Sequence, residues 1–412
     1  MKYKINPVLV AALALLITLG CSMANFSNTP PAASTPTLTP PASQTPSQTS
    51  VPTDMPAAQP TATTTLPPLP TAAPVDELPL LPGTILYTRI FPQNGRNHVG
   101  VFSMTSDGQN QTALSSSESA AMLGQRSPDG RWLVYFDLLG AKPALTAMDL
   151  TNPQQQPRAL FELLDDNLFE FSWSADSRFV VYAYAQPDGS EMDIYRLEIE
   201  TGQLVDLTED SLVWDFAPSW SPDGSWIVFV SDRTEDGKAL DDIFRMSPDG
   251  QIVERLTDNG YDWEDKYPAW SPDGTRIAFF RASMMASAST PDGPAGLWVM
   301  NADGSDPHLV MASSGIWPGS KPVWSPDGRW LAFTEGLIGS TLWLVSVDGT
   351  DQRPLEAGDG EYSDPCWSPD SAALIVTYVG GDNYKLNLYQ LELELMTEIP
   401  LGAAGFGCQW LP

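Results

Sequence analysis

Positive charge, histidine and cysteine are all scarce in this sequence of 412 residues. Lys and Arg total 21 against 51 Asp and Glu, so the formal net charge is −30, and the chain has only two His and three Cys. A chain this acidic repels nucleic-acid phosphates and anionic membrane surfaces, which disfavours electrostatic binding to either. The shortage of His and Cys argues against a built-in zinc or iron site, so we expect no resident metal or cofactor.

The amino-terminal segment has the pattern of an export signal. Lys2 and Lys4 precede an apolar run over 8–17, and Cys21 follows shortly after it. This run is too short to span a bilayer comfortably, which takes roughly 20 apolar residues. It resembles a bacterial lipoprotein signal, which implies a signal peptide over 1–21 and lipid attachment at Cys21. A secretory signal cut near Ala24 and a short uncleaved anchor are the alternatives, and all three export the protein.

Residues 22–80 have the composition of a disordered linker. The stretch 30–74 holds 13 Pro and 15 Ser or Thr, no aromatic residue, and Asp54 as its only charge. Such a segment cannot bury a core, and its prolines keep the backbone extended. We therefore expect a semi-rigid stalk in front of a folded domain over 81–412.

The folded domain is built from one repeated unit. An apolar strand ending in Trp is followed by Ser-Pro-Asp-Gly or a relative of it, with anchors at positions 126, 173, 220, 270, 324, 367 and 410. The spacings of 47, 47, 50, 54, 43 and 43 residues between these anchors are typical of propeller blades. The Trp residues fit as wedges between blades.

Each unit divides into four short strands joined by tight turns. Apolar and polar residues alternate in four short segments of one such unit, over 216–220, 226–231, 242–247 and 252–257. In the turn, Pro fixes φ, Asp caps locally and Gly takes the left-handed position. The aspartates expected to have this structural role are Asp129, Asp223, Asp273, Asp327 and Asp370.

The two ends of the domain predict how the ring closes. Segments 85–90, 99–104 and 111–115 match strands two, three and four of a blade that lacks its first strand, and 406–410 has the sequence of a first strand. Pairing of the carboxyl-terminal strand with 85–90 would close the ring and remove its exposed edges. The prediction is an all-β, seven-bladed propeller, with six blades as the alternative if the unit near Arg126 is something else.

The repeat Pro-x-Trp-Ser-Pro-Asp-Gly, seen over 218–224, 268–274 and 322–328, resembles the blades of TolB-like propellers. It is also similar to the propeller domains of prolyl oligopeptidase-like and tricorn-type peptidases. The resemblance covers roughly 81–412 and implies a fold more firmly than a function. TolB itself has a folded α/β domain before its propeller and works in the periplasm with a peptidoglycan-associated lipoprotein. Here a stalk stands in that place.

The sequence offers little for catalysis. It has no Gly-x-Ser-x-Gly nucleophile turn and no room for a hydrolase domain, which argues against a serine peptidase. His98 starts a third strand and His308 starts a fourth strand. Neither histidine has an obvious catalytic partner in the sequence, so we do not expect either to act as a general base. Carboxylate chemistry in the propeller mouth stays open, because acids are frequent.

Recognition is expected on the face formed by the blade-to-blade loops and the loops between strands two and three. Aromatic residues there accompany acids, which suggests a site for a cationic peptide, a sugar or a Ca²⁺-bridged ligand. The alternative is that the rings pack between blades while the acids solvate the rim. The candidates are Trp214, Asp215, Tyr261, Trp263, Glu264, Asp265, Trp317 and Tyr362.

A disulfide between Cys366 and Cys408 is left open by the sequence. An oxidising compartment favours the bond, which would fasten the closing strand. The two cysteines stand one and two residues before Trp367 and Trp410, and these unequal offsets point the side chains to different faces of their sheets.

Two functions remain. The first is a non-catalytic, membrane-anchored binding or scaffold lipoprotein, monomeric and facing the periplasm or the cell exterior, that presents its propeller to an envelope protein or glycan and not to nucleic acid. The alternative is an exported carbohydrate-active or other hydrolytic enzyme that uses carboxylates in the propeller mouth.

Overall fold

The protein is described here from a computed structural model. It describes 81–93, 96–115, 121–137, 143–152, 155–162, 171–185, 191–209, 213–233, 241–258, 263–283, 295–313, 320–335, 341–381 and 383–412. The signal peptide, Cys21 and the stalk lie outside these ranges. Within them, the regular elements are strands, and we find no helix long and apolar enough to cross a membrane.

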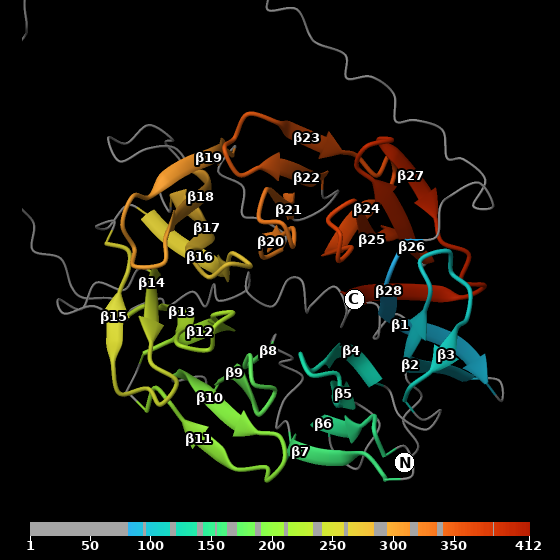
Figure 1. Cartoon of the computed structure of the whole chain (residues 1–412), viewed down its shortest axis with the longest axis horizontal. Coiled ribbons are helices and arrows are strands. Elements are labelled where there is room, and N and C mark those ends of the chain that lie inside the picture. The colour runs from blue at the N-terminus through green and yellow to red at the C-terminus, as the bar shows by residue number, and fades with distance from the viewer. Residues whose placement is uncertain are drawn as a thin grey trace, which may run out of the picture. The chain divides into compact units, whose positions relative to one another are not determined.

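The strands form seven four-stranded antiparallel sheets, as the repeat predicts (Figure 1). Three sheets in chain order make blades 2 to 4. Blade 2 contains β4 (Ala121–Arg126), β5 (Trp132–Asp137), β6 (Ala144–Asp149) and β7 (Arg158–Glu162). Blade 3 contains β8 (Phe171–Trp173), β9 (Phe179–Ala185), β10 (Met192–Glu198) and β11 (Leu204–Asp206). Blade 4 contains β12 (Asp215–Trp220), β13 (Ile227–Ser231), β14 (Asp242–Met246) and β15 (Val253–Arg255).

Three further sheets in chain order complete most of the ring. Blade 5 contains β16 (Trp263–Trp270), β17 (Arg276–Ser283), β18 (Gly296–Asn301) and β19 (His308–Ala312). Blade 6 contains β20 (Val323–Trp324), β21 (Trp330–Glu335), β22 (Thr341–Ser346) and β23 (Gln352–Leu355). Blade 7 contains β24 (Glu361–Trp367), β25 (Ala373–Gly380), β26 (Asn383–Gln390) and β27 (Leu395–Glu398).

Blade 1 closes the ring with strands from both ends of the domain. Its order is β28 (Ala404–Leu411), β1 (Thr84–Gln93), β2 (Arg96–Met104) and β3 (Thr112–Ala113). The carboxyl-terminal β28 pairs with β1 in the register Ile85↔Trp410, so the predicted closure is confirmed. The first strand of every blade lies on the inside of the ring (Figure 1).

The hydrophobic core is divided among the seams between blades. Seven buried clusters occur, and each joins two neighbouring blades, including blades 7 and 1 across the closure. The repeated Trp residues lie at these seams. The indole nitrogens of Trp270, Trp324 and Trp367 each donate to a backbone oxygen of the preceding blade, at 3.0 to 3.1 Å. Burial of the rings and these bonds together hold each blade against its neighbour.

The repeated turns are held by their own side chains. In six copies the Asp Oδ1 accepts a hydrogen bond from the Ser hydroxyl two residues earlier, at 2.5 to 2.6 Å. Glycine follows at the left-handed position in most copies, as at Gly224 with φ of 73°. Ser177 and Ser371 replace it with φ of 61°, and their hydroxyls accept from the backbone of Asp129 and Asp327 in the preceding blade. The five aspartates expected to have this structural role all make this hydrogen bond, namely Asp129, Asp223, Asp273, Asp327 and Asp370.

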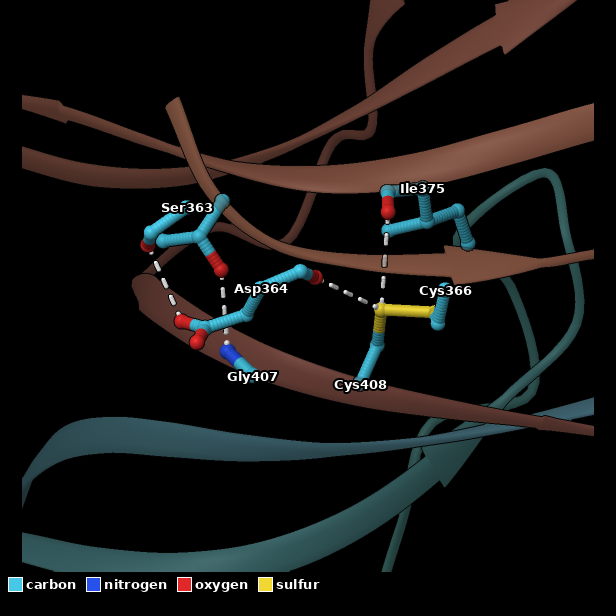
Figure 2. The surroundings of a disulfide bond; sticks show 7 residues. Ser363, Asp364, Cys366, Ile375, Gly407 and Cys408 are labelled. Atoms are coloured by element: carbon cyan, nitrogen blue, oxygen red, sulfur yellow. Dashed lines mark hydrogen bonds between the residues drawn. A yellow bond between two sulfur atoms is a disulfide. The ribbon is translucent and has the colours of Figure 1, made fainter. Parts of the chain in front are cut away.

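A disulfide joins Cys366 on β24 to Cys408 on β28, with the Cα atoms 6.0 Å apart (Figure 2). The unequal offsets that argued against the bond in fact favour it. Trp367 packs toward blade 6 and Trp410 toward blade 7. Cys366, which alternates with Trp367, therefore faces blade 1, while Cys408, which shares a side with Trp410, faces blade 7. A bond between two packed sheets joins side chains on the faces that the sheets turn toward each other. The unequal offsets place both cysteines on those faces, so their sulfurs meet.

The two ends of the blades differ in what they carry. The end with the Asp-containing turns between strands one and two, and between strands three and four, is called the turn face. The opposite end, with the loops between strands two and three and the blade-to-blade loops, is called the loop face. Each inner strand begins at the loop face and ends at the turn face.

Candidate functional site

The candidate residues of blades 4 and 5 gather at the loop-face ends of two inner strands. Asp215 begins β12, and Trp263, Glu264 and Asp265 begin β16. Both strands contain a bulge farther along, where Ala217 and Tyr267 have φ of 53° and 56°. The sequence interpretation placed 261–265 in a loop. The inner strand in fact continues past the bulge, so three of these residues belong to a sheet.

The carboxylates at these strand ends are buried and paired with arginines. Arg281 donates from Nε and Nη2 to the two oxygens of Asp265 at 2.8 and 2.9 Å, and both side chains are buried, at 7% and 0% exposed. Asp215 is fully buried and paired with Arg233. Burial raises the pKa of the Asp215 carboxyl, although Arg233 acts in the opposite direction. These acids therefore form part of the structure, and they do not solvate the rim.

A lysine joins blade 4 to blade 5 at the same place. The Lys266 Nζ lies 2.9 Å from an Asp241 oxygen and 3.0 Å from a Glu264 oxygen. Burial disfavours the ammonium charge, but the two carboxylates outweigh it and raise the pKa of Lys266. The backbone nitrogen of Asp265 also donates to the backbone oxygen of Asp241 at 2.8 Å. The ends of β16 and β14 are thus fixed against each other.

The aromatic candidates divide between buried and half-buried. Trp263 is 2% exposed and Tyr362, in β24, is 4% exposed. Both side chains are interior, so the interpretation that they anchor a ligand by direct contact does not hold in this structure. Trp214 directly precedes β12 and is half-buried, and its backbone nitrogen donates to the Asp232 carboxylate at 2.7 Å. Tyr261 and Trp317 lie outside the described residues.

Two buried polar atoms at this site have no hydrogen-bond partner in the described part of the chain. They are Oδ1 of Asp215 and Nε1 of Trp263. Within the same ranges no group of three His, Cys, Asp or Glu side chains is arranged to hold a metal ion. The carboxylates here are occupied by cationic side chains, so a Ca²⁺-bridged ligand stays a prediction.

The blades match the model of the TolB beta propeller domain over residues 85–371. This is well over half of the chain. The chain belongs to the TolB β-propeller family.

Several proteins are similar to this TolB-family chain. An uncharacterized protein of Agrobacterium fabrum is 32% identical over 210 residues, which is 50% of this chain and 67% of that protein. The Tol-Pal system protein TolB of Francisella tularensis is 26% identical over 210 residues, which is 46% of this chain and only 43% of that protein.

Two solved structures share the fold at low identity. An oligogalacturonate lyase in complex with manganese has a TM-score of 0.56 at 13% identity. The aligned part is 71% of this chain and 83% of the lyase chain. The propeller domain of the Trilobed protease of Pyrococcus furiosus, described as having an open velcro topology, has a TM-score of 0.55 at 14% identity, covering 77% of this chain and 95% of its own. In the present TolB-family ring β28 pairs with β1 and closes it.

Sequence reasoning found the acids of this propeller but missed their basic partners. Arg233 and Arg281 each follow or end a second strand, at the same loop-face end as Asp215 and Asp265. The signal was available in the strand register, because Asp265 and Arg281 stand directly opposite each other on β16 and β17. Counting strands without assigning register hid this pairing.

Stability should depend on pH through Asp242, which lies at the start of β14. Burial raises the pKa of this carboxyl to about 6, against the opposing effect of Arg255, while the charge of Asp265 raises it further. Because the folded-state pKa lies above the unfolded one, the folded state binds more protons between pH 4 and 6, and stability falls as pH rises through this window. Between pH 4 and pH 7, we expect the free energy of unfolding of wild type to fall by on the order of 2 kcal/mol relative to that of Asp242→Asn.

Urea unfolding of both proteins across this pH range is the measurement. Arg255 keeps Asp258 as a partner at 3.0 Å in the variant, so its charge is not stranded. A difference between the two proteins that does not change with pH would contradict the expectation.

Proposed function

We propose that this chain is an exported, membrane-tethered, non-catalytic binding protein whose propeller recognises another envelope protein or polymer. In this proposal Cys21 carries the lipid, 22–80 is the stalk, and the domain faces the periplasm or the cell exterior. The naming of a similar TolB as a Tol-Pal system protein supports an envelope role, although the chain spans less than half of that relative.

One observation carries the proposal. The loop-face ends of blades 4 and 5 form a charged platform whose carboxylates are paired with arginines, and half-buried Trp214 directly precedes Asp215 of this platform. A rigid scaffold with a partly exposed aromatic residue fits recognition, since such residues are frequent anchors at interfaces. Ion pairing of Asp215 and Asp265 also leaves them poorly suited to move protons.

The hydrolytic alternative has one observation in its favour. Asp241 and Glu264 both contact Lys266, so their carboxylates are close enough to resemble an acid pair. The ammonium between them occupies the place that a scissile oxygen would need. Release of reducing ends from envelope polysaccharide by wild type, and not by Asp241→Asn/Glu264→Gln, would favour this alternative.

The binding proposal is tested by capture from solubilised cell envelope with the tagged full-length chain. Trp214→Ala changes the loop face of blade 4, and Trp226→Ala is its matched control, because Trp226 is also half-buried but lies on the turn face. We expect the first variant to lose a specifically retained partner at least tenfold and the second to keep it, since truncating an aromatic anchor costs 2 kcal/mol or more.

Parallel captures with Ca²⁺ and with a chelator test the cation-bridged form. Equal retention by both Trp variants would overturn the assignment to the loop face. No retention by wild type, together with polysaccharide cleavage, would replace the proposal by the hydrolytic one.

A further inference from the structure

On the turn face, arginine side chains form hydrogen bonds across three of the seams between neighbouring blades. From blades 2, 3 and 4 they reach the turn between strands three and four of the next blade. Arg196 Nη1 donates to the Pro248 oxygen at 2.5 Å and Arg245 Nη1 to the Ala302 oxygen at 2.8 Å. Arg158, the first residue of β7, donates in the same way to the Ile199 oxygen.

In the described part of the chain, no arginine of blade 5 reaches the turn between strands three and four of blade 6. His308 begins β19 at the position that Arg158 has in β7, and its Nδ1 lies 3.1 Å from the Asp306 oxygen of its own blade. Two longer hydrogen bonds cross this seam on the turn face. Arg276 of blade 5 donates to the Gly328 oxygen, in the turn between strands one and two of blade 6, at 3.2 Å, and Gln352 of blade 6 donates to the Val310 oxygen of blade 5 at 3.4 Å. Blades 5 and 6 lie in the upper arc of the ring in Figure 1.

A groove of about 940 Å³ occupies this part of the turn face. This volume lies at the upper end of the range for ligand sites. Its lining comes from blades 5, 6 and 7, and the groups that matter for recognition are Arg276, Trp330, Asp348, Arg353, Asp370 and Glu392.

Some charges in the groove are already paired. Arg353 contacts Asp351 at 2.7 Å and Glu394 at 3.4 Å, and it stacks on Trp330 at 5.0 Å from the ring centre. Arg329 contacts Asp327 of its own turn at 2.7 Å, and its side chain is 78% exposed. These groups form the walls and carry little unbalanced charge.

Other charges have no ionic partner among the described residues. The guanidinium of Arg276 donates to the Gly328 oxygen at 3.2 Å and lies over Trp324, but forms no ion pair there. Asp348, Asp370 and Glu392 are likewise without a cation in the described ranges. Hydrogen bonds from Ser346 and Thr350 lower the pKa of Asp348 to about 2, so this carboxylate is charged throughout the physiological range.

We propose that this groove is a recognition site for a basic segment of another polypeptide, with a carboxylate of that segment bound by Arg276. The inference rests on the proposed binding function and adds a second site at the opposite end of the ring. Three unpaired carboxylates accept lysine or arginine side chains, and a guanidinium can hold a carboxylate bidentately. The net charge of −30 attracts such a segment from a distance. Leu393, 59% exposed next to Glu392, offers an apolar contact at the rim.

The test uses the full-length chain and a fluorescein-labelled peptide of alternating glycine and lysine with a free terminal carboxylate. Its amidated form and a glycine–glutamate peptide are the comparison probes. Anisotropy at physiological salt should show binding of the free-acid lysine peptide, several-fold weaker binding of the amide, and none of the glutamate peptide. Arg276→Gln should remove the difference between acid and amide.

A matched pair of variants separates the groove from general surface charge. Asp348→Asn/Asp370→Asn removes two carboxylates of the groove. Asp249→Asn/Asp223→Asn removes the equivalent turn carboxylates of blade 4, outside the groove. We expect about tenfold weaker binding for the first variant and less than about twofold for the second. Thermal unfolding of both variants controls for damage to the turns.

Equal weakening by both variants would overturn the proposal, because it would indicate only long-range attraction. Binding of polygalacturonate in preference to the lysine peptide would also overturn it and assign the groove to an acidic glycan. The assay needs no envelope partner and leaves Trp214 unchanged, so its failure is distinct from failure of the loop-face proposal.

Discussion

Removal of the Cys366–Cys408 disulfide is expected to lower the free energy of unfolding by roughly 4 kcal/mol, as the chain-entropy relation gives for this loop length. The bond closes a loop with a sequence separation of 42 and links the inner strand of blade 7 to the closing strand of blade 1. Without it β28 is held by its pairing with β1 and by burial of Trp410. The released loop gains conformational freedom in the unfolded chain.

Urea unfolding of Cys366→Ala/Cys408→Ala and of wild type, each with and without reductant, measures this effect. Alanine suits the site because Cys366 is 8% exposed and lies in the apolar cluster of blades 7 and 1. Reductant should weaken wild type to near the variant and leave the variant unchanged. A loss below about 1 kcal/mol, or a variant that still responds to reductant, would contradict the expectation.

The sulfur surroundings explain why little else should change. The Cys408 sulfur lies 3.6 Å from the backbone oxygens of Asp364 and Ile375 (Figure 2). The neighbouring Gly407 nitrogen donates to the Thr377 hydroxyl at 2.9 Å. This bond, from the backbone of blade 1 to a side chain of blade 7, does not depend on the disulfide, so the seam should open only at its edge.

The fold could be predicted because its information is local and repeated. Ser-Pro-Asp-Gly specifies a turn by itself, and its recurrence at blade spacing specifies the ring. Closure followed from the same logic, since 406–410 had the pattern of a first strand with no partner after it. The disulfide was harder to predict from the sequence, because it depends on which face of each sheet a cysteine side chain occupies relative to the neighbouring blade.

The candidate site was predictable only in part, for a related reason. Trp263 and Asp265 were recognised as an aromatic residue beside an acid, but their burial depends on where β16 begins. The bulge at Tyr267 interrupts the alternation, so the strand appears to start later than it does. Pairing of Asp265 with Arg281 needs the register of two strands, which a single repeat does not reveal.

The groove on the turn face could not be seen from the motifs at all. His308 lines it at the position where blade 2 has an arginine, whereas arginines of blades 2, 3 and 4 each reach the turn between strands three and four of the next blade. Its volume depends on three blades at once. Sequence analysis favoured the loop face because aromatic residues accompany acids there, whereas the groove on the turn face is formed by side chains from three blades.

Breaking the Asp265–Arg281 pair should cost 3 to 5 kcal/mol of stability, the range for leaving one member of a buried ion pair alone. In Asp265→Ala the guanidinium stays buried, stacked over Trp298 at 4.6 Å from the ring centre, with its main counter-charge removed. Asp265→Leu/Arg281→Met removes both charges and should return to within about 2 kcal/mol of wild type, because well-packed apolar residues often replace such a pair at little cost.

Equilibrium urea unfolding at neutral pH, followed by tryptophan fluorescence, measures these variants. The exposed pair of Lys385 and Glu398 is the control, with side chains 43% and 55% exposed and a distance of 2.7 Å. Its removal by Glu398→Ala should cost less than about 1 kcal/mol, because solvent screens it. A double variant at blade 5 as unstable as the single one would show that packing, and not charge, sets the cost. Recovery in the double variant would show that the pair fixes the geometry of the loop-face platform more than it stabilises the fold.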